Sequence, residues 1–167
     1  MATRTDFSPE QWQALRNAPQ LVALATAAAG NSGLFGSLSE GMAMASTMVE
    51  ALRGDQPLLK EIFSKDEMRA AQDQIKGTLK TLTDRTALNA HLQKAATDAV
   101  SAALAALSAK GTAADTAAFR TLLAGIGDKV ANASTEGGFL GIGGERVSDG
   151  ERKFLAQLNA LVGSKLA

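Results

Sequence analysis

The stretch from Asp84 to Gly111 reads DRTALNAHLQKAATDAVSAALAALSAKG and decides the fold class of this chain. It contains a series of apolar residues spaced by three or four positions, which is the spacing of one face of an α-helix. The cation and the glycine at Lys110 and Gly111 are typical of a helix C-terminus. The stretch predicts one long helix from about Asp84 to Ala109, with an inward face formed by Leu88, Leu92, Ala96, Val100, Leu104 and Leu107.

Helix signals continue toward the N-terminus. The run from Ser8 to Gln11 predicts a helix start, with Ser8 as the cap, Pro9 in the first turn and Gln11 closing a capping box. Pro19 then predicts a kink or a new helix start near Asn17, because proline removes a hydrogen bond from the helix interior. We expect the alanine-rich helix that follows to end at Gly30.

Three further segments before the long helix have helical patterns. The first is a helix from about Leu38 to Arg53, and the second is a short helix from Pro57 through Phe63. A capping box from Ser64 to Glu67 predicts the start of the third. The predicted apolar face of the first helix is Met42, Ala45, Met48, Val49 and Leu52, and that of the third is Met68, Ala71, Ile75, Leu79 and Leu82.

Two more helices are predicted after the long one. The helix from Thr112 to Thr135 contains Gly125 and Gly127, which lower helix stability and indicate a close backbone contact or a bend. A cap from Ser148 to Glu151 starts the last helix. The predicted apolar residues are Phe119, Leu122, Leu123, Ile126 and Val130 in the first, and Phe154, Leu155, Leu158 and Leu161 in the second.

The pattern as a whole predicts an all-α fold, namely a compact single domain of seven or eight helices over residues 1–167. The composition agrees: 46% of the residues are hydrophobic but only 4% are aromatic, so aliphatic side chains and alanine must fill the core. The chain carries 17 basic and 17 acidic residues, and such a balance argues against a nucleic-acid partner. Cysteine is absent, which excludes disulfides and thiolate zinc sites.

Location follows from the apolar stretches. The longest, Leu21–Ala29 and Ala99–Leu107, are shorter than the roughly 20 residues that a transmembrane helix needs. We therefore expect no transmembrane segment. The first residues also lack the apolar core of a secretory signal, so a cytoplasmic location is expected.

Two short motifs occur twice in the same order. Gly33–Gly36 (GLFG) matches Gly138–Gly141 (GFLG), and Leu38–Gly41 matches Val147–Gly150. One hypothesis is an internal duplication, in which two helix–loop–helix units pack around a pseudo-twofold axis. The alternative is that a composition biased toward alanine and glycine produces such matches by itself.

The glycine-rich segment from Glu136 to Glu145 (EGGFLGIGGE) is the most distinctive part of the chain. Its spacing does not match a nucleotide-binding loop, and apolar residues stand where calcium ligands would be needed. Two interpretations of Phe139, Leu140 and Ile142 stay open. They form a plug that completes the core, or they form an exposed apolar contact for a partner protein, a membrane surface or a second copy of the chain.

The helix start at Val147, Ser148 and Glu151, with the alanine-rich helix and glycine turn before it, resembles the repeated unit of TerB-like tellurite-resistance proteins. The resemblance implies a small, duplicated all-α bacterial protein with an acidic face that binds a divalent metal. Its matched positions make Glu136 and Glu151 the candidate metal ligands. The first half departs from the pattern, with Gly30 and Asn31 where an acid is expected and Met42 where the helix-start glutamate falls.

These observations favour a non-enzymatic, cytoplasmic helical protein of the stress-response or accessory type, acting through protein contacts. The sequence contains no catalytic motif and no cofactor signature, and His91 is its single histidine. Two alternatives are a divalent-metal-binding TerB-like domain and an enzyme whose site is assembled across several helices. A deep polar pocket with perturbed carboxylates would favour the enzyme.

Overall fold

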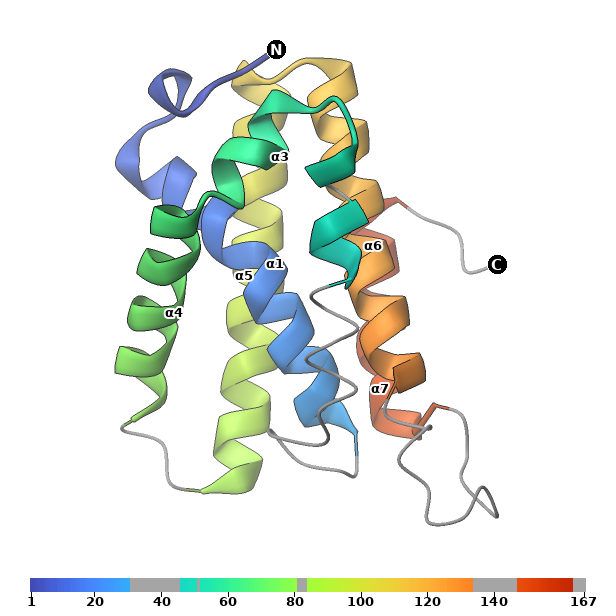
Figure 1. Cartoon of the computed structure of the whole chain (residues 1–167). Coiled ribbons are helices and arrows are strands. Elements are labelled where there is room, and N and C mark those ends of the chain that lie inside the picture. The colour runs from blue at the N-terminus through green and yellow to red at the C-terminus, as the bar shows by residue number, and fades with distance from the viewer. Residues whose placement is uncertain (31–45, 51, 81–83, 134–146, 164–167) are drawn as a thin grey trace.

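A computed structural model describes residues 1–30, 46–50, 52–80, 84–133 and 147–163 of the chain. These residues form helices and no strand, so the predicted all-α fold is confirmed (Figure 1). Residues 46–50 and 52–53 are also helical, and a short 3-10 helix spans Arg4–Asp6. The α-helices are α1 (Pro9–Ala29), α3 (Pro57–Ile62), α4 (Lys65–Leu79), α5 (Arg85–Lys110), α6 (Ala113–Ala133) and α7 (Asp149–Val162).

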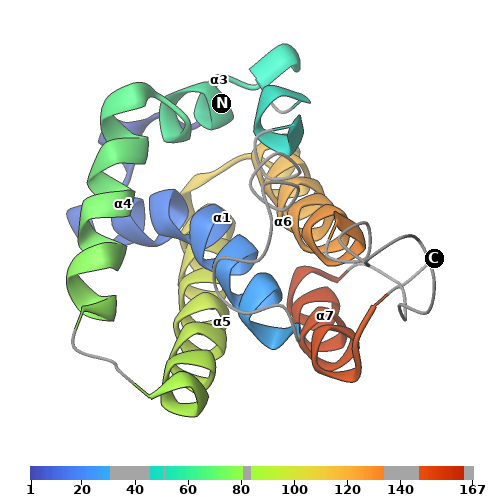
Figure 2. The same cartoon turned by 60° about the horizontal axis from the view of Figure 1, so that its bottom comes forward.

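Helix α1 is the central element of the bundle. It packs against α4, α5, α6 and α7, and Figures 1 and 2 show it with α4 on one side and with α6 and α7 on the other. Its inward residues are small or aliphatic, and Leu15, Ala18 and Val22 are fully buried. Small side chains allow two helix backbones to approach closely, and this explains how α1 and α5 share the largest helix–helix interface.

The long predicted helix is confirmed as α5. The Asp84 side chain accepts a hydrogen bond from the backbone N–H of Ala87 at 2.7 Å, and the C-terminal cap is Gly111. The predicted inward face is largely correct. Leu92, Ala96, Val100 and Leu107 are buried, and Leu88 and Leu104 are partly buried against the same core.

The sequence predicted a kink or a new helix start near Asn17, and of these the new start is wrong. Helix α1 runs without interruption from Pro9 to Ala29, with Pro19 inside it. Pro19 lacks the N–H that would bond to the Leu15 carbonyl, which by itself destabilises a helix. Nearly every residue from Asn17 to Ala29 is buried, so packing against neighbouring helices holds the helix together through the proline.

The three predicted caps differ in outcome. Ser8 with Gln11 and Ser148 with Glu151 both form complete capping boxes, as predicted. Ser64 does begin α4, but its side chain makes no capping bond, so the predicted box with Glu67 is wrong. The reason is that two arginines bind the Glu67 carboxylate, which therefore does not reach back to Ser64.

The predicted inward face of the helix before α3 is also wrong at two positions. Val49 is 47% exposed and Leu52 is 37% exposed, whereas Thr47 is buried and Met48 packs partly against the core. The helix is rotated so that Thr47 faces α6, where Gly125 provides room for its methyl group. Met42 and Ala45 lie outside the described residues.

The last two helices agree with the predictions. In α6, all five predicted inward residues are buried, and in α7 the predicted face is buried except for the partly buried Leu161. Gly127 makes the expected close contact, because a Cβ atom there would lie 2.8 Å from Leu155 Cδ2 and 3.0 Å from Leu158 Cδ2. Within the described residues, no helix combines the length and the apolar character needed to cross a membrane.

Candidate functional site

The junction between the end of α1 and the start of α7 contains the predicted site residue Glu151. Its Oε2 atom accepts hydrogen bonds from the backbone N–H and the hydroxyl of Ser148, both at 2.8 Å. The backbone N–H of Glu151 donates to Ser148 Oγ at 3.2 Å. The Oε1 atom lies beside Gly30, 2.8 Å from where a Cβ atom of that residue would be. Glu151 is 1% exposed, so its carboxylate caps α7 and fills the space at the end of α1.

This geometry bears on the predicted metal site. Glu136, the other candidate ligand, lies outside the described residues. Among the residues that the structure describes, no three histidine, aspartate or glutamate side chains are grouped closely enough to hold an ion. Metal binding therefore stays a prediction, and it would require the buried Glu151 carboxylate to exchange its hydrogen bonds for metal coordination.

We expect calcium or magnesium at millimolar concentration to leave the melting temperature unchanged, because the Glu151 carboxylate is already hydrogen-bonded. An ion at 100 times its Kd would stabilise the fold by about 2.7 kcal/mol. For a chain of this size, that stabilisation raises the melting temperature by roughly 5–10 °C. Thermal melts with each ion and with EDTA measure the effect. A rise of several degrees that EDTA reverses would contradict this expectation and support the metal site.

The glycine-rich segment with Phe139, Leu140 and Ile142 lies outside the described residues, so neither interpretation of it is tested. The residues that flank it are described. Helix α6 ends at Ala133 and α7 begins at Asp149, both at the end of the bundle where α1 ends (Figure 1). A Cβ atom on Gly150 would lie 2.3 Å from the Ala29 carbonyl oxygen. The C-terminal end of α1 and the N-terminal end of α7 are therefore in direct contact.

A second buried carboxylate, Asp115, lies at the start of α6. Its Oδ2 atom accepts hydrogen bonds from the backbone N–H groups of Ala2 and Thr112, both at 3.0 Å, and from the Thr112 hydroxyl at 2.8 Å. Burial acts to raise the pKa of Asp115, but these hydrogen bonds outweigh it and lower the pKa below its ordinary value. Asp115 was not among the site residues predicted from the sequence. The spacing of Thr112 and Asp115 is typical of a helix N-cap and could have been predicted from the sequence. No local sequence pattern indicates the contact with Ala2, which is far away in the chain.

A mainly apolar recess, which we call the α6 groove, lies between α6 and the helical residues 46–53. It has a volume of about 370 Å³. Its floor is mainly apolar, and the Glu50 carboxylate and the Lys129 ammonium form an ion pair of 2.5 Å across it. The groove is lined by Thr47, Glu50, Leu59, Ala118, Thr121, Leu122, Gly125 and Lys129.

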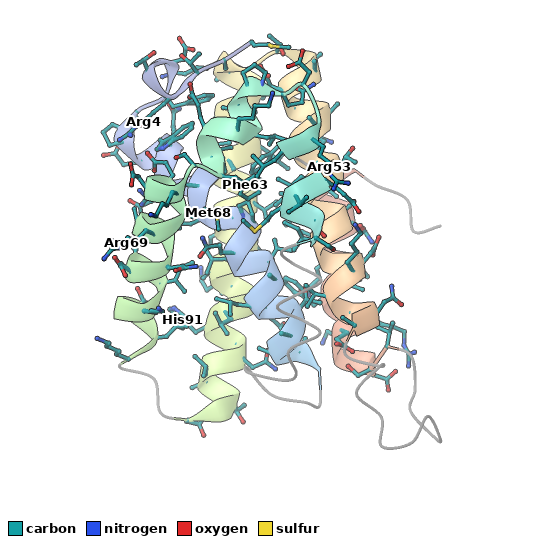
Figure 3. All side chains as sticks on the ribbon, viewed as in Figure 1. Arg4, Arg53, Phe63, Met68, Arg69 and His91 are labelled. Atoms are coloured by element: carbon teal, nitrogen blue, oxygen red, sulfur yellow. The ribbon has the colours of Figure 1, made fainter. Side chains whose placement is uncertain are left out.

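Exposed aliphatic side chains stand next to the α6 groove. Val49 and Leu52 are one helical turn apart on the segment that supplies Thr47 and Glu50 to the groove. Arg53, at the end of this segment, is exposed and labelled in Figure 3. The described residues contain one other exposed large hydrophobic residue, Met1. Sequence reasoning placed both aliphatic residues in the core, so the surface they form became visible only in the structure.

A second groove, of about 380 Å³, lies between α1 and α5. Four of its nine lining residues are alanines, and its polar residues include Glu10, Asn17 and Asp98. Hydrogen bonds from the Glu10 backbone N–H and the Ser8 hydroxyl lower the pKa of Glu10. A carboxyl group with a lowered pKa is ionised at neutral pH and is a poor proton donor there. Nothing in this groove adds support to the enzyme alternative.

No family model, no curated protein and no solved structure matches this chain. The TerB-like resemblance therefore stays a prediction. Of the positions that define it, Ser148 and Glu151 act together in the cap of α7.

Proposed function

We propose that this protein is a non-enzymatic helical accessory protein that acts through protein contacts, and that it binds an amphipathic helix of a partner protein along the α6 groove. The observation that carries the proposal is the exposure of Val49 and Leu52 beside that groove. Large aliphatic side chains are usually buried, and an exposed pair next to an apolar recess is typical of a protein interaction site.

The shape of the groove favours a helix as its occupant. The α6 residues that line it include Ala118, Leu122, Gly125 and Lys129, which are three or four positions apart. They follow one face of α6 for about 16 Å at 1.5 Å per residue. An elongated apolar recess of this kind complements the apolar stripe of an amphipathic helix.

The charged residues of the groove indicate what flanks that stripe. Glu50 and Lys129 form an ion pair with each other, and Arg53 is exposed on the same segment as Glu50. A partner helix with an acidic residue beside its apolar stripe would complement the charge of Arg53. The further assignment to stress response extends the TerB-like resemblance, and a cytoplasmic location is consistent with a cysteine-free chain.

We predict that the double variant Val49→Ser and Leu52→Ser loses its partner and keeps its fold. Both side chains are substantially exposed, so stability should change by about 1 kcal/mol or less. Removing two apolar contacts should weaken binding by at least tenfold. Affinity purification from the native cells, followed by urea denaturation of the purified variant, measures both effects. The matched control is Gln72→Ser with Lys76→Ser on the exposed face of α4.

Gly125→Ala tests the groove itself. The nearest described atom to a Cβ at this position is Thr47 Cγ2 at 3.8 Å, an ordinary contact, so the methyl group fits without strain. The change should raise stability by up to about 1 kcal/mol, because alanine favours the helix interior. It also places a methyl group in the groove and should weaken partner binding. Equal recovery of one partner by all variants would overturn the proposal, and concentration-dependent dimerisation in sedimentation would assign the surface to a second copy.

A further inference from the structure

Helix α4 has a small apolar interface for its length. Its main packing partners are α1 and α3, and Figure 2 shows it at the edge of the bundle. Of its 15 residues, only Glu67, Ala71 and Ile75 are buried. An isolated helix of this length is marginally stable in water, so α4 depends on its contacts with α1. Its apolar contacts are those of Ala71 and Ile75, which are buried, and of Met68 and Leu79, which are partly buried against the core.

A carboxylate held between two arginines supplies the strongest polar contact. Glu67 Oε1 lies 2.6 Å from Arg4 Nη1, and Glu67 Oε2 lies 3.2 Å from Arg16 Nη1. We call these three residues the Glu67 clamp. Figure 3 labels Arg4 in the N-terminal segment, and Arg16 comes from α1, so the clamp joins three parts of the chain. Charged hydrogen bonds of this kind are stronger than neutral ones.

Further polar contacts join α1 and α4. Gln74 Oε1 accepts hydrogen bonds from Arg16 Nη2 at 2.9 Å and from Asn17 Nδ2 at 3.1 Å. The Gln20 amide donates to the Met68 carbonyl at 3.2 Å. Polar contacts therefore run along the interface between α4 and α1. Replacing these hydrogen bonds by hydrogen bonds to water costs less free energy than exposing buried apolar side chains.

The connection between α3 and α4 is suited to be a hinge. Leu58, Leu59 and Ile62 fix α3 in the core. Ser64, at the start of α4, makes no side-chain capping bond, and the Glu67 carboxylate is bound by the arginines. The first turn of α4 is thus held by the clamp and by the partly buried Met68 side chain. Without the clamp, α4 can rotate about Ser64 while α3 stays in place.

We propose that α4 is a releasable helix, which the Glu67 clamp holds against α1 and which opens as a unit while α1, α5, α6 and α7 stay folded. Opening exposes Ala71, Ile75 and the facing strip of α1. Ionic strength controls the release. The Arg4 side chain is 65% exposed, so dissolved salt screens its attraction to Glu67.

Hydrogen exchange of the full chain, read by mass spectrometry, tests this proposal. Local opening raises the exchange of the amides in α4 without changing the amides that exchange by global unfolding. We expect Glu67→Gln to raise the exchange rate of residues 65–79 by about tenfold or more, and that of α5 and α7 by less than about twofold. Raising NaCl from about 0.05 to 0.5 M should act in the same direction on the unmodified protein.

The matched control is Asp98→Asn, which removes the exposed Lys94–Asp98 ion pair on α5 and should leave α4 unchanged. Arg4→Gln serves as a second variant that leaves Arg16 and Glu67 paired, and it should raise α4 exchange by a smaller factor. The proposal is wrong if Glu67→Gln leaves α4 exchange unchanged. It is also wrong if the exchange rates of α4 and α5 rise together in both variants and at high salt. In that result α4 opens only by global unfolding.

Discussion

Replacing Gly150 with alanine is expected to destabilise the protein by about 2–4 kcal/mol. The added Cβ would lie 2.3 Å from the carbonyl oxygen of Ala29 and 3.3 Å from its carbonyl carbon. These are backbone atoms of α1, so no side-chain rotation relieves the overlap. The start of α7 must move away from α1, and this movement also disturbs the Ser148–Glu151 cap beside Gly30.

Urea denaturation of the variant measures this loss, with Gly77→Ala as the control. Gly77 is an exposed residue inside α4, and a Cβ there meets no described atom within 4 Å. The control should gain up to about 1 kcal/mol from the better helix propensity of alanine. If the Gly150 variant gains stability as the control does, the close contact between the ends of α1 and α7 is wrong.

Phe119→Ala is expected to cost about 3–5 kcal/mol. The Phe119 side chain is fully buried in α6, within the core cluster that α1 and α5 share. Its removal loses the free energy of burying the ring and leaves a cavity that the surrounding helices fill only in part. Urea denaturation measures this loss of unfolding free energy. We expect the midpoint to fall while the dependence of the unfolding free energy on urea concentration stays unchanged, as in a two-state transition.

The stability loss of Phe119→Ala also serves as the reference value for a test of the glycine-rich segment. If Phe139 completes the core, Phe139→Ala should approach the loss measured for Phe119→Ala. If Phe139 is an exposed contact, stability should stay within about 0.5 kcal/mol and association should weaken instead. A loss of about 3 kcal/mol or more with unchanged association would contradict the contact interpretation. Sedimentation of both variants, at the same protein concentrations, separates the two outcomes.

Helix starts were predictable where all partners lie within three residues of one another. Ser8 with Gln11 and Ser148 with Glu151 are such cases, and both boxes form. The sequence from Ser64 to Glu67 has the same spacing, but its carboxylate binds Arg4 and Arg16 instead. Both arginines are more than 50 positions away in the chain, so no local pattern indicates the competition.

The errors about the core have the same origin. A short amphipathic helix shows which residues share a face, but the neighbouring elements decide which face turns inward. Thr47 turns toward Gly125 on α6, and Val49 and Leu52 therefore point to solvent. The α6 groove could not be predicted for this reason. Pro19 is the reverse case, since burial of the residues around it outweighs an unfavourable local preference.

The central position of α1 has a consequence for how the protein is made. The ribosome synthesises α1 before any of its partners, at about 5–20 residues per second. The largest of its interfaces, with α5, can begin to form only after residue 85 has left the exit tunnel, several seconds later. During that interval, the alanine- and leucine-rich face of α1 has no native partner on the nascent chain. Holdase chaperones that bind apolar segments are therefore expected to act on this chain early in synthesis and to release it once α5 and α6 emerge.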